Sequence, residues 1–278
     1  MGAIYEPRGP AREYSKLALS TYKGCDHHCD YCFAPCFAYR MKPAAIQKEL
    51  FKKPTVIGSE KYTEEQRVVR LLKQVAREAK NFTTNYPDNP RVLLSFTSDP
   101  YQQCERKYRV TGQILKILAE CKVPATVLTK NPALALELDA KVIAESGTHL
   151  ATTIVWSQES SREKWESGAP SLESRYKALQ KAKELGITTW VSIEPVIDAK
   201  EGLEVIRNLI GMTSLVKIGG IDKRWNKEVY DSVNWPEFLL EALRIVNIRH
   251  QNYYIKDHLW KHVNEDSKKF ARSKGYEP

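Results

Sequence analysis

The sequence lacks any long apolar run. No apolar segment of its 278 residues reaches the length of about 18 that a membrane-spanning helix requires. The first residues also contain no basic head followed by an apolar core, which is the pattern of a signal peptide. We therefore expect no membrane partner and a cytoplasmic location.

Cysteine is scarce and unevenly placed. Four of the six cysteines lie between residues 25 and 36, and no second group follows them. A disulfide framework would spread its cysteines along the chain, and zinc modules usually supply their ligands as two separated pairs. In a reducing compartment, one tight cluster indicates metal binding or catalysis, whereas Cys104 and Cys121 are expected to be structural thiols.

Three of the clustered cysteines, Cys25, Cys29 and Cys32, form the pattern CxxxCxxC. Thiolates select soft metals, and three of them on a four-iron cluster would leave one iron open for another ligand. The alternative is a structural zinc site, which closes its tetrahedron with a fourth cysteine or histidine. Neighbouring candidates for that ligand exist, so both interpretations remain open; they are Cys36, His27 and His28.

Basic residues outnumber acidic ones by 43 to 34, which gives a formal net charge of +9. Such a balance would suit a polyanionic partner such as DNA or RNA. The basic residues concentrate at 40–53 and 256–274, and runs of this kind are also the usual composition of a solvated helix face or tail.

Short β-branched runs alternate with longer amphipathic segments, which is the pattern of repeated β-α units around a parallel sheet. The expected strands span residues 17–21, 92–97, 125–129, 150–156, 188–193, 215–219 and 253–256. The expected helices span residues 64–81, 108–121, 132–146, 172–185, 201–210 and 236–248. We predict an α/β protein with an extension over 1–13, one domain over 14–260 and a polar tail over 261–278.

Polar groups follow the carboxyl ends of most of these strands, which is the edge where parallel α/β folds build their sites. They are Cys25, Asp99, Lys130, Trp156, Glu194 and the pair Gly219 and Gly220. Ser98 and Asp99 could face the amine or hydroxyl groups of a ligand, or could simply cap a turn before Pro100. Lys130 suits a carboxylate or phosphate, although most lysines only stay solvated.

The cysteine motif, followed by the aromatic Phe33, resembles that of radical S-adenosylmethionine (SAM) enzymes. Over residues 14–256 the chain resembles the spore photoproduct lyase-like, or DNA repair photolyase-like, branch of that superfamily. The segments that carry this resemblance are GCDHHCDYCFA, SFTSDPYQQCE, VLTKN, GAPSLESR and YYIKDHL. It implies a partial (β/α)6 TIM-type barrel whose open edge holds a 4Fe-4S cluster, with SAM bound to the unique iron.

The resemblance also implies roles for individual residues. Cys25, Cys29 and Cys32 match the cluster ligands, and Phe33 matches the aromatic beside the adenine. Contacts to SAM are implied for Ser98, Lys130 and Thr153. Arg175 and Glu194 are weaker candidates for cofactor or substrate contact, because one could be a helix-surface arginine and the other a solvated carboxylate at a strand end.

The implied chemistry is one-electron cleavage of SAM to a 5′-deoxyadenosyl radical, which takes hydrogen from a substrate in a lyase-like or transferase-like reaction. Such clusters work near −400 mV, so flavodoxin or ferredoxin is the expected electron donor. The lyase has a hydrogen-donating cysteine where this chain has Phe96, so its substrate is expected to differ. Cys36 would block SAM as a fourth ligand, and a zinc-stabilised nucleic-acid-binding protein remains the alternative.

Overall fold

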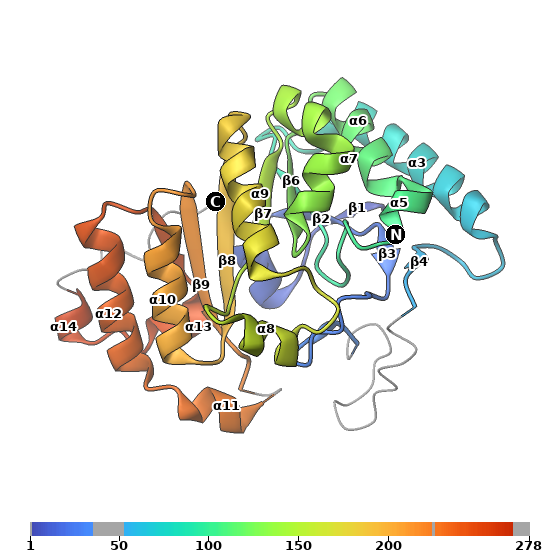
Figure 1. Ribbon diagram of the computed structural model, residues 1–278. Helices are drawn as coiled ribbons and strands as arrows, with labels where there is room; N and C mark the ends of the chain where they lie inside the picture. Colours follow the sequence, from blue (N-terminus) through green and yellow to red (C-terminus); the bar gives the residue numbers. More distant parts are fainter. Residues whose placement is uncertain (1, 36–52, 224–225, 269–278) are drawn as a thin grey trace.

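The computed structural model describes residues 2–35, 53–223 and 226–268. Its centre is an eight-stranded sheet in which β1 pairs antiparallel with β2 and every other pairing is parallel (Figure 1). In spatial order the strands are β1 (Ile4–Tyr5), β2 (Leu17–Leu19), β5 (Val92–Leu94), β6 (Ala125–Thr129), β7 (His149–Thr153), β8 (Thr189–Val196), β9 (Leu215–Gly220) and β10 (Tyr253–Ile255). The predicted α/β class and the seven predicted strands are confirmed, with ends shifted by a few residues.

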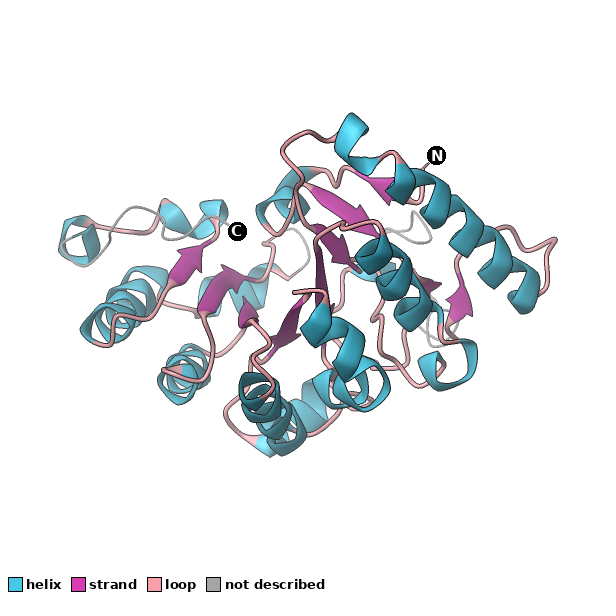
Figure 2. Cartoon of the chain, turned by 90° about the horizontal axis from the view of Figure 1, so that it is seen from above, coloured by secondary structure: helices cyan, strands magenta, loops and turns pink. Residues whose placement is uncertain are grey.

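The six predicted helices are also present, and in Figure 2 they line the convex side of the curved sheet. They are α3 (Glu64–Lys80), α6 (Val110–Glu120), α7 (Pro132–Glu145), α9 (Leu172–Glu184), α10 (Ala199–Leu209) and α12 (Trp235–Ile248). Parallel strands covered by helices on the outside form a partial TIM-type barrel. Within the described ranges, no helix has the length and apolarity to span a membrane.

Several shorter elements were not predicted, because they are too short to show a helical or strand period. They are β1, η1 (Gly9–Glu13), β3 (Tyr22–Lys23), β4 (Thr55–Val56), α4 (Phe82–Asn85), α5 (Glu105–Tyr108), α8 (Glu159–Trp165), α11 (Lys227–Ser232), α13 (Asp257–Trp260) and α14 (Glu265–Lys268). β3 and β4 form an antiparallel pair beside the cysteine segment.

The two faces of the sheet differ in chemistry. Outward residues such as Val191 and Ile193 belong to a large apolar core under the helices. The alternate residues, such as Trp190, point to the concave inner face, where the apolar cluster is small. Polar side chains also alternate onto this inner face, and they include Ser192, Lys217 and Lys256. The inner face of the sheet therefore carries polar groups that the outer core lacks.

The two ends of the chain take part in the fold. β1 extends the sheet, and η1 leads into Tyr14, which packs against Trp190 on the inner face. The predicted polar tail contains α14 and the buried Val263, so its first part packs on the domain. Residues 36–52 and 269–278, which include Cys36 and much of both basic runs, lie outside the described residues.

Candidate functional site

The cysteine motif occupies the loop that follows β3. Gly24 and His28 have left-handed backbone angles, with φ of 86° and 52°, and turn the chain sharply on either side of Cys25. The Cys32 amide donates to the Cys29 carbonyl at 3.1 Å and closes the next turn. These turns bring the three cysteines to one place, where each is half-buried and none is in a disulfide.

The environment of these thiols opposes their ionisation in the absence of metal. Burial raises the pKa of Cys29 to about 12, against an opposing effect of Lys130. Burial, followed by the charge of Asp99, raises the pKa of Cys25 well above its usual value. Metal coordination requires thiolates, so a bound cation must supply the compensating charge. In the part of the chain that the structure describes, no three histidine, cysteine or acidic side chains enclose a single metal ion.

The end of α8 and the segment that follows it contact the cysteine loop. Cys29 forms an isolated antiparallel bridge with Glu166. The Asp30 amide donates to the Trp165 carbonyl at 2.9 Å, and the Gly168 amide donates to the His27 carbonyl at 3.1 Å. The loop is therefore fixed by backbone contacts on both sides of Cys29.

A buried ion pair lies at the centre of this support. The Arg175 guanidinium donates to the Glu166 carboxylate, and both side chains are fully buried. Tyr31, inside the cysteine motif, donates its phenol to the same carboxylate. Arg175 also donates to the backbone carbonyls of Pro170 at 3.1 Å and Thr153 at 2.9 Å. Arg175 is thus not a helix-surface residue; its contact with a cofactor or substrate stays a prediction.

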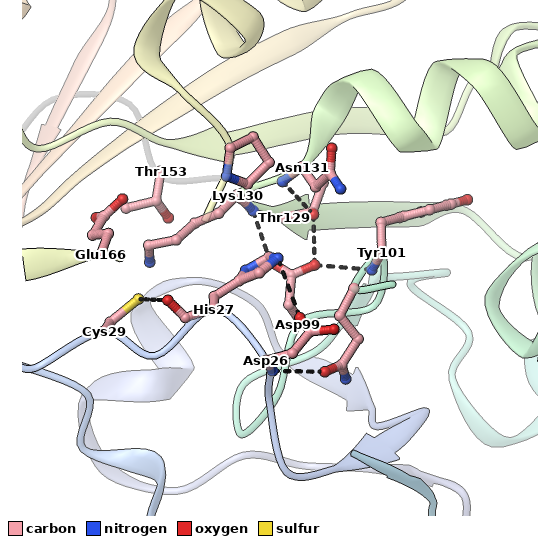
Figure 3. A network of polar contacts seen from close by, with 12 residues as sticks. Asp26, His27, Cys29, Asp99, Tyr101, Thr129, Lys130, Asn131, Thr153 and Glu166 are labelled. Atoms are coloured by element: carbon pink, nitrogen blue, oxygen red, sulfur yellow. Dashed lines mark hydrogen bonds and ion pairs between the residues drawn. The ribbon is translucent and has the colours of Figure 1, made fainter. Parts of the chain in front are cut away.

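Asp99 organises the opposite side of the site (Figure 3). Its carboxylate accepts hydrogen bonds from the Tyr101 amide at 2.8 Å, the Thr129 hydroxyl at 2.6 Å and the Lys130 amide at 2.7 Å. His27 Nδ1 lies 3.3 Å from the same group. Burial alone would raise the pKa of Asp99, but His27 and these donors lower it to about 2. Asp99 therefore holds the end of β6 in place through hydrogen bonds, and His27 faces its carboxylate.

Lys130 extends from the Asp99 network toward Cys29, Thr153 and Glu166 (Figure 3). Burial lowers the pKa of Lys130, but the charges of Cys29 and Glu166 outweigh it and raise the pKa above its usual value. Thr153 ends β7 beside it and is 7% exposed. The structure thus brings Lys130 and Thr153 together with the cysteine loop, and their contacts with a cofactor stay predictions.

Three predicted site residues remain to be placed, namely Ser98, Phe33 and Glu194. The Ser98 hydroxyl donates to the Tyr22 carbonyl at 2.8 Å and joins the turn after β5 to β3. Phe33 follows the last cysteine and is 42% exposed. Glu194 belongs to a second inner-face cluster, where it accepts from the Tyr14 phenol and from Lys256 Nζ at 3.2 Å. The ligand contacts assigned to these residues stay predictions.

Sequence reasoning missed Glu166, which belongs to the site, and Ser95, which directly follows β5. Glu166 has no periodic or motif signal of its own, although it lies two residues before the segment GAPSLESR. Ser95 is 4% exposed, has a left-handed φ of 86°, and its hydroxyl has no partner among the described residues. Backbone strain and an unpaired buried hydroxyl gather at functional sites, but only the structure reveals them.

Comparison with protein-family models gave no match. Uncharacterized proteins of Mycobacterium tuberculosis and Mycobacterium bovis are each 24% identical over 212 residues, covering 74% of this chain and 57% of theirs. An uncharacterized protein of Acidianus two-tailed virus is 24% identical over 160 residues, covering 54% of this chain and 52% of its own. The chain thus spans somewhat more than half the length of these relatives.

Two solved structures share the fold. Spore photoproduct lyase complexed with dinucleoside spore photoproduct superposes with a TM-score of 0.62 at 16% identity, covering 90% of this chain and 78% of the lyase. SuiB of Streptococcus suis bound to S-adenosylmethionine gives a TM-score of 0.55 at 13% identity, covering 88% of this chain and 48% of SuiB. The chain therefore has the fold of radical SAM enzymes, of the type found in spore photoproduct lyase.

The residues present fit an iron-sulfur cluster. Three half-buried thiols outside disulfides share one tightly turned loop. The ammonium of Lys130 extends toward one of them, Cys29. The donor set is all sulfur, because His27 lies against Asp99. Soft thiolate ligands of this kind select iron-sulfur clusters, copper(I) or zinc. The zinc alternative keeps only His28 and Cys36 as further ligands, and Cys36 is outside the described residues.

Proposed function

We propose that the chain is a radical SAM enzyme in which Cys25, Cys29 and Cys32 hold a 4Fe-4S cluster. The observation that carries the proposal is the position of these thiols in this fold, beside Lys130 and Thr153 at the carboxyl edge of the sheet. When bound and reduced, the cluster would cleave SAM to a 5′-deoxyadenosyl radical that takes hydrogen from a substrate in a lyase-like or transferase-like reaction.

The chain's own residues would bind and orient the cofactor. Lys130 extends its ammonium toward Cys29, where this charge suits the carboxylate of SAM. Thr153 offers a buried hydroxyl next to this ammonium. Phe33 presents a partly exposed ring on which the adenine could stack. The Glu166 and Arg175 pair would keep the loop in place while the cluster changes its charge. A reducing, cytoplasmic compartment would keep the thiols available.

The partners belong to the same proposal. We assign a flavodoxin or ferredoxin as electron donor, because the cluster needs an electron near −400 mV. We further propose DNA or RNA as the substrate class, supported by the net charge of +9. Phosphate contacts predict that binding of an oligonucleotide weakens as salt rises, and a salt-independent affinity would argue against it.

Anaerobic reconstitution tests the proposed activity. We expect about four irons with sulfide per chain, and dithionite-dependent formation of 5′-deoxyadenosine from SAM. Cys32→Ala should abolish both, whereas Cys121→Ala, at the far end of α6, should change neither. One zinc per chain, or a Cys32→Ala variant with unchanged iron, would overturn the proposal.

A further inference from the structure

Lys217 places an amine inside the barrel that the cofactor site does not use. The side chain lies on β9, faces the inner side of the sheet and is 1% exposed. Its Nζ makes one long hydrogen bond, 3.4 Å, to the Tyr14 carbonyl. It otherwise faces the rings of Trp190 at 4.3 Å and Tyr14 at 4.9 Å. A protonated lysine has three donors, so a buried one with a single weak partner lacks acceptors.

The carboxylates nearest to this amine are already engaged by other groups. Glu194 accepts from Lys256 Nζ at 3.2 Å and from the Tyr14 phenol. Glu13 accepts from the Tyr254 phenol at 3.1 Å and the Asp257 amide at 2.8 Å. Within the described residues, no carboxylate forms an ion pair with Lys217. An acceptor brought by a ligand would complete its hydrogen bonding.

The electrostatics of the cluster agree with this geometry. Burial, followed by the charge of Lys256, lowers the pKa of Lys217 to about 7, and Glu194 and Glu13 oppose this only in part. The groups that face the amine are therefore Lys256, Glu194, Glu13 and Tyr14. A neighbouring anion would stabilise the protonated amine that the protein alone does not stabilise.

Strand register relates this amine to the cofactor side. Thr129 pairs with Thr152, so the residues that follow them, Lys130 and Thr153, stand opposite each other. Thr153 pairs with Ser192, and Ser192 pairs with Lys217. One row across the inner face therefore runs from Lys130 to Lys217. Neighbouring strands lie about 4.8 Å apart, which puts the two ends of the row roughly 14 Å apart across the sheet. A substrate between the two amines would thus reach the cofactor at one end and Lys217 at the other.

We propose that Lys217 is the recognition point for an anionic oxygen, carboxylate or phosphate, of the substrate. This inference rests on the proposed function, because it assigns the substrate class of the same barrel. Tyr14 covers the amine from the N-terminal segment and is held in place by its hydrogen bonds to Glu194 and Ser192. Entry of the anion requires the Tyr14 ring to move aside.

Equilibrium dialysis of the reconstituted protein with radiolabelled orthophosphate and, separately, acetate tests this site. We expect one equivalent of the preferred anion to bind, and at least tenfold weaker binding by Lys217→Met. Lys183→Met is the matched control, because Lys183 is an exposed lysine of α9 that donates to the Gly211 carbonyl. The preferred probe separates a phosphate-bearing from a carboxylate-bearing substrate. Absence of binding by the wild type, or equal binding by Lys217→Met, overturns the proposal.

A second measurement needs no variant. Carbon-13 NMR of the wild-type holoenzyme with labelled lysine follows the lysine signal that titrates near pH 7, and the preferred anion should raise its midpoint by about one pH unit. An unchanged midpoint overturns the site. Production of 5′-deoxyadenosine by the wild type is measured in parallel. Anion binding without this product would refute the proposed function, whereas the product without anion binding would refute only the Lys217 site.

Discussion

The carboxylate of Glu166 and the guanidinium of Arg175 form an ion pair in which both side chains are fully buried. The pair joins the cysteine loop, through Tyr31 and the bridge to Cys29, to the end of β7. Three further groups hydrogen-bond to this charged pair: the Tyr31 phenol and the carbonyls of Pro170 and Thr153. Disturbing it should affect both the stability of the fold and the position of the thiols.

Replacing Glu166 with glutamine should be strongly destabilising. The change leaves the buried Arg175 cation uncompensated, and breaking a buried pair in this way costs about 3 to 5 kcal/mol. Urea unfolding gives the free energy, and iron per chain should fall as well. Arg106 and Glu137 form an exposed pair whose side chains are 49% and 53% exposed. Glu137→Gln should therefore change the free energy of unfolding little, because solvent screens an exposed pair, and equal losses in the two variants would contradict the role of the buried pair.

A methyl group at Gly168 should displace the cysteine loop. An added Cβ would lie 2.2 Å from the Asp26 carbonyl oxygen, a backbone atom that can move only with the loop. We expect Gly168→Ala to lower the iron content of reconstituted protein by at least half. Gly147→Ala meets no atom within 4 Å and has a φ of 66°, so it should cost about 1 kcal/mol of stability and leave iron unchanged. Full iron loading of Gly168→Ala would show that the loop tolerates the shift.

Phe33→Ala should weaken cofactor binding more than it weakens the fold. The ring is 42% exposed, so its removal should lower the free energy of unfolding by less than about 1 kcal/mol. Loss of a stacking surface for adenine should raise the Kd for SAM by about tenfold, measured by equilibrium dialysis of reconstituted protein. Val69→Ala, at an α3 residue that is 49% exposed, is the control and should leave the Kd unchanged. An unaltered Kd in Phe33→Ala would remove this residue from the cofactor site.

His149 should make the fold sensitive to mild acid. Burial, with a contribution from Arg91, lowers the pKa of His149 to about 4, whereas an unfolded histidine titrates near 6.5. The unfolded state therefore binds the proton first, and stability that is present above pH 6.5 is lost as the pH falls toward 4. The loss should reach about 2 to 3 kcal/mol. Urea unfolding at pH 7.5 and 4.5 should show a smaller decline in His149→Gln, and parallel declines would contradict the assignment.

Much of the architecture could be predicted because local sequence patterns specify it. The strands β6 and β9 are β-branched runs, and the cysteine spacing is a local motif. Strand order then brought Lys130 and Thr153 to the cysteine loop, since parallel strands end at one edge. Local patterns carry no information on which polar side chains are buried together.

That limit explains what the sequence could not predict. Arg175 reads as a surface position of an amphipathic helix, yet it is buried because Glu166, Pro170 and Thr153 surround its guanidinium. Tyr14 is the first residue of the predicted domain and lies outside every predicted strand and helix, yet its hydroxyl reaches Ser192 and its ring covers Lys217. Such contacts join residues up to 203 positions apart, and only the folded chain specifies them.

Side chains along β8 alternate between the two faces of the sheet, so neighbouring residues of this strand are under different constraints. Val191 and Ile193 face the helices and need only the right volume, so similar apolar residues should replace them at modest cost. Ser192 and Glu194, between and beyond them, face Tyr14 and Lys256 and depend on specific polar atoms. A new substrate could therefore be accommodated by changing every second residue of β8 to β10, with the hydrophobic core and the metal loop left intact.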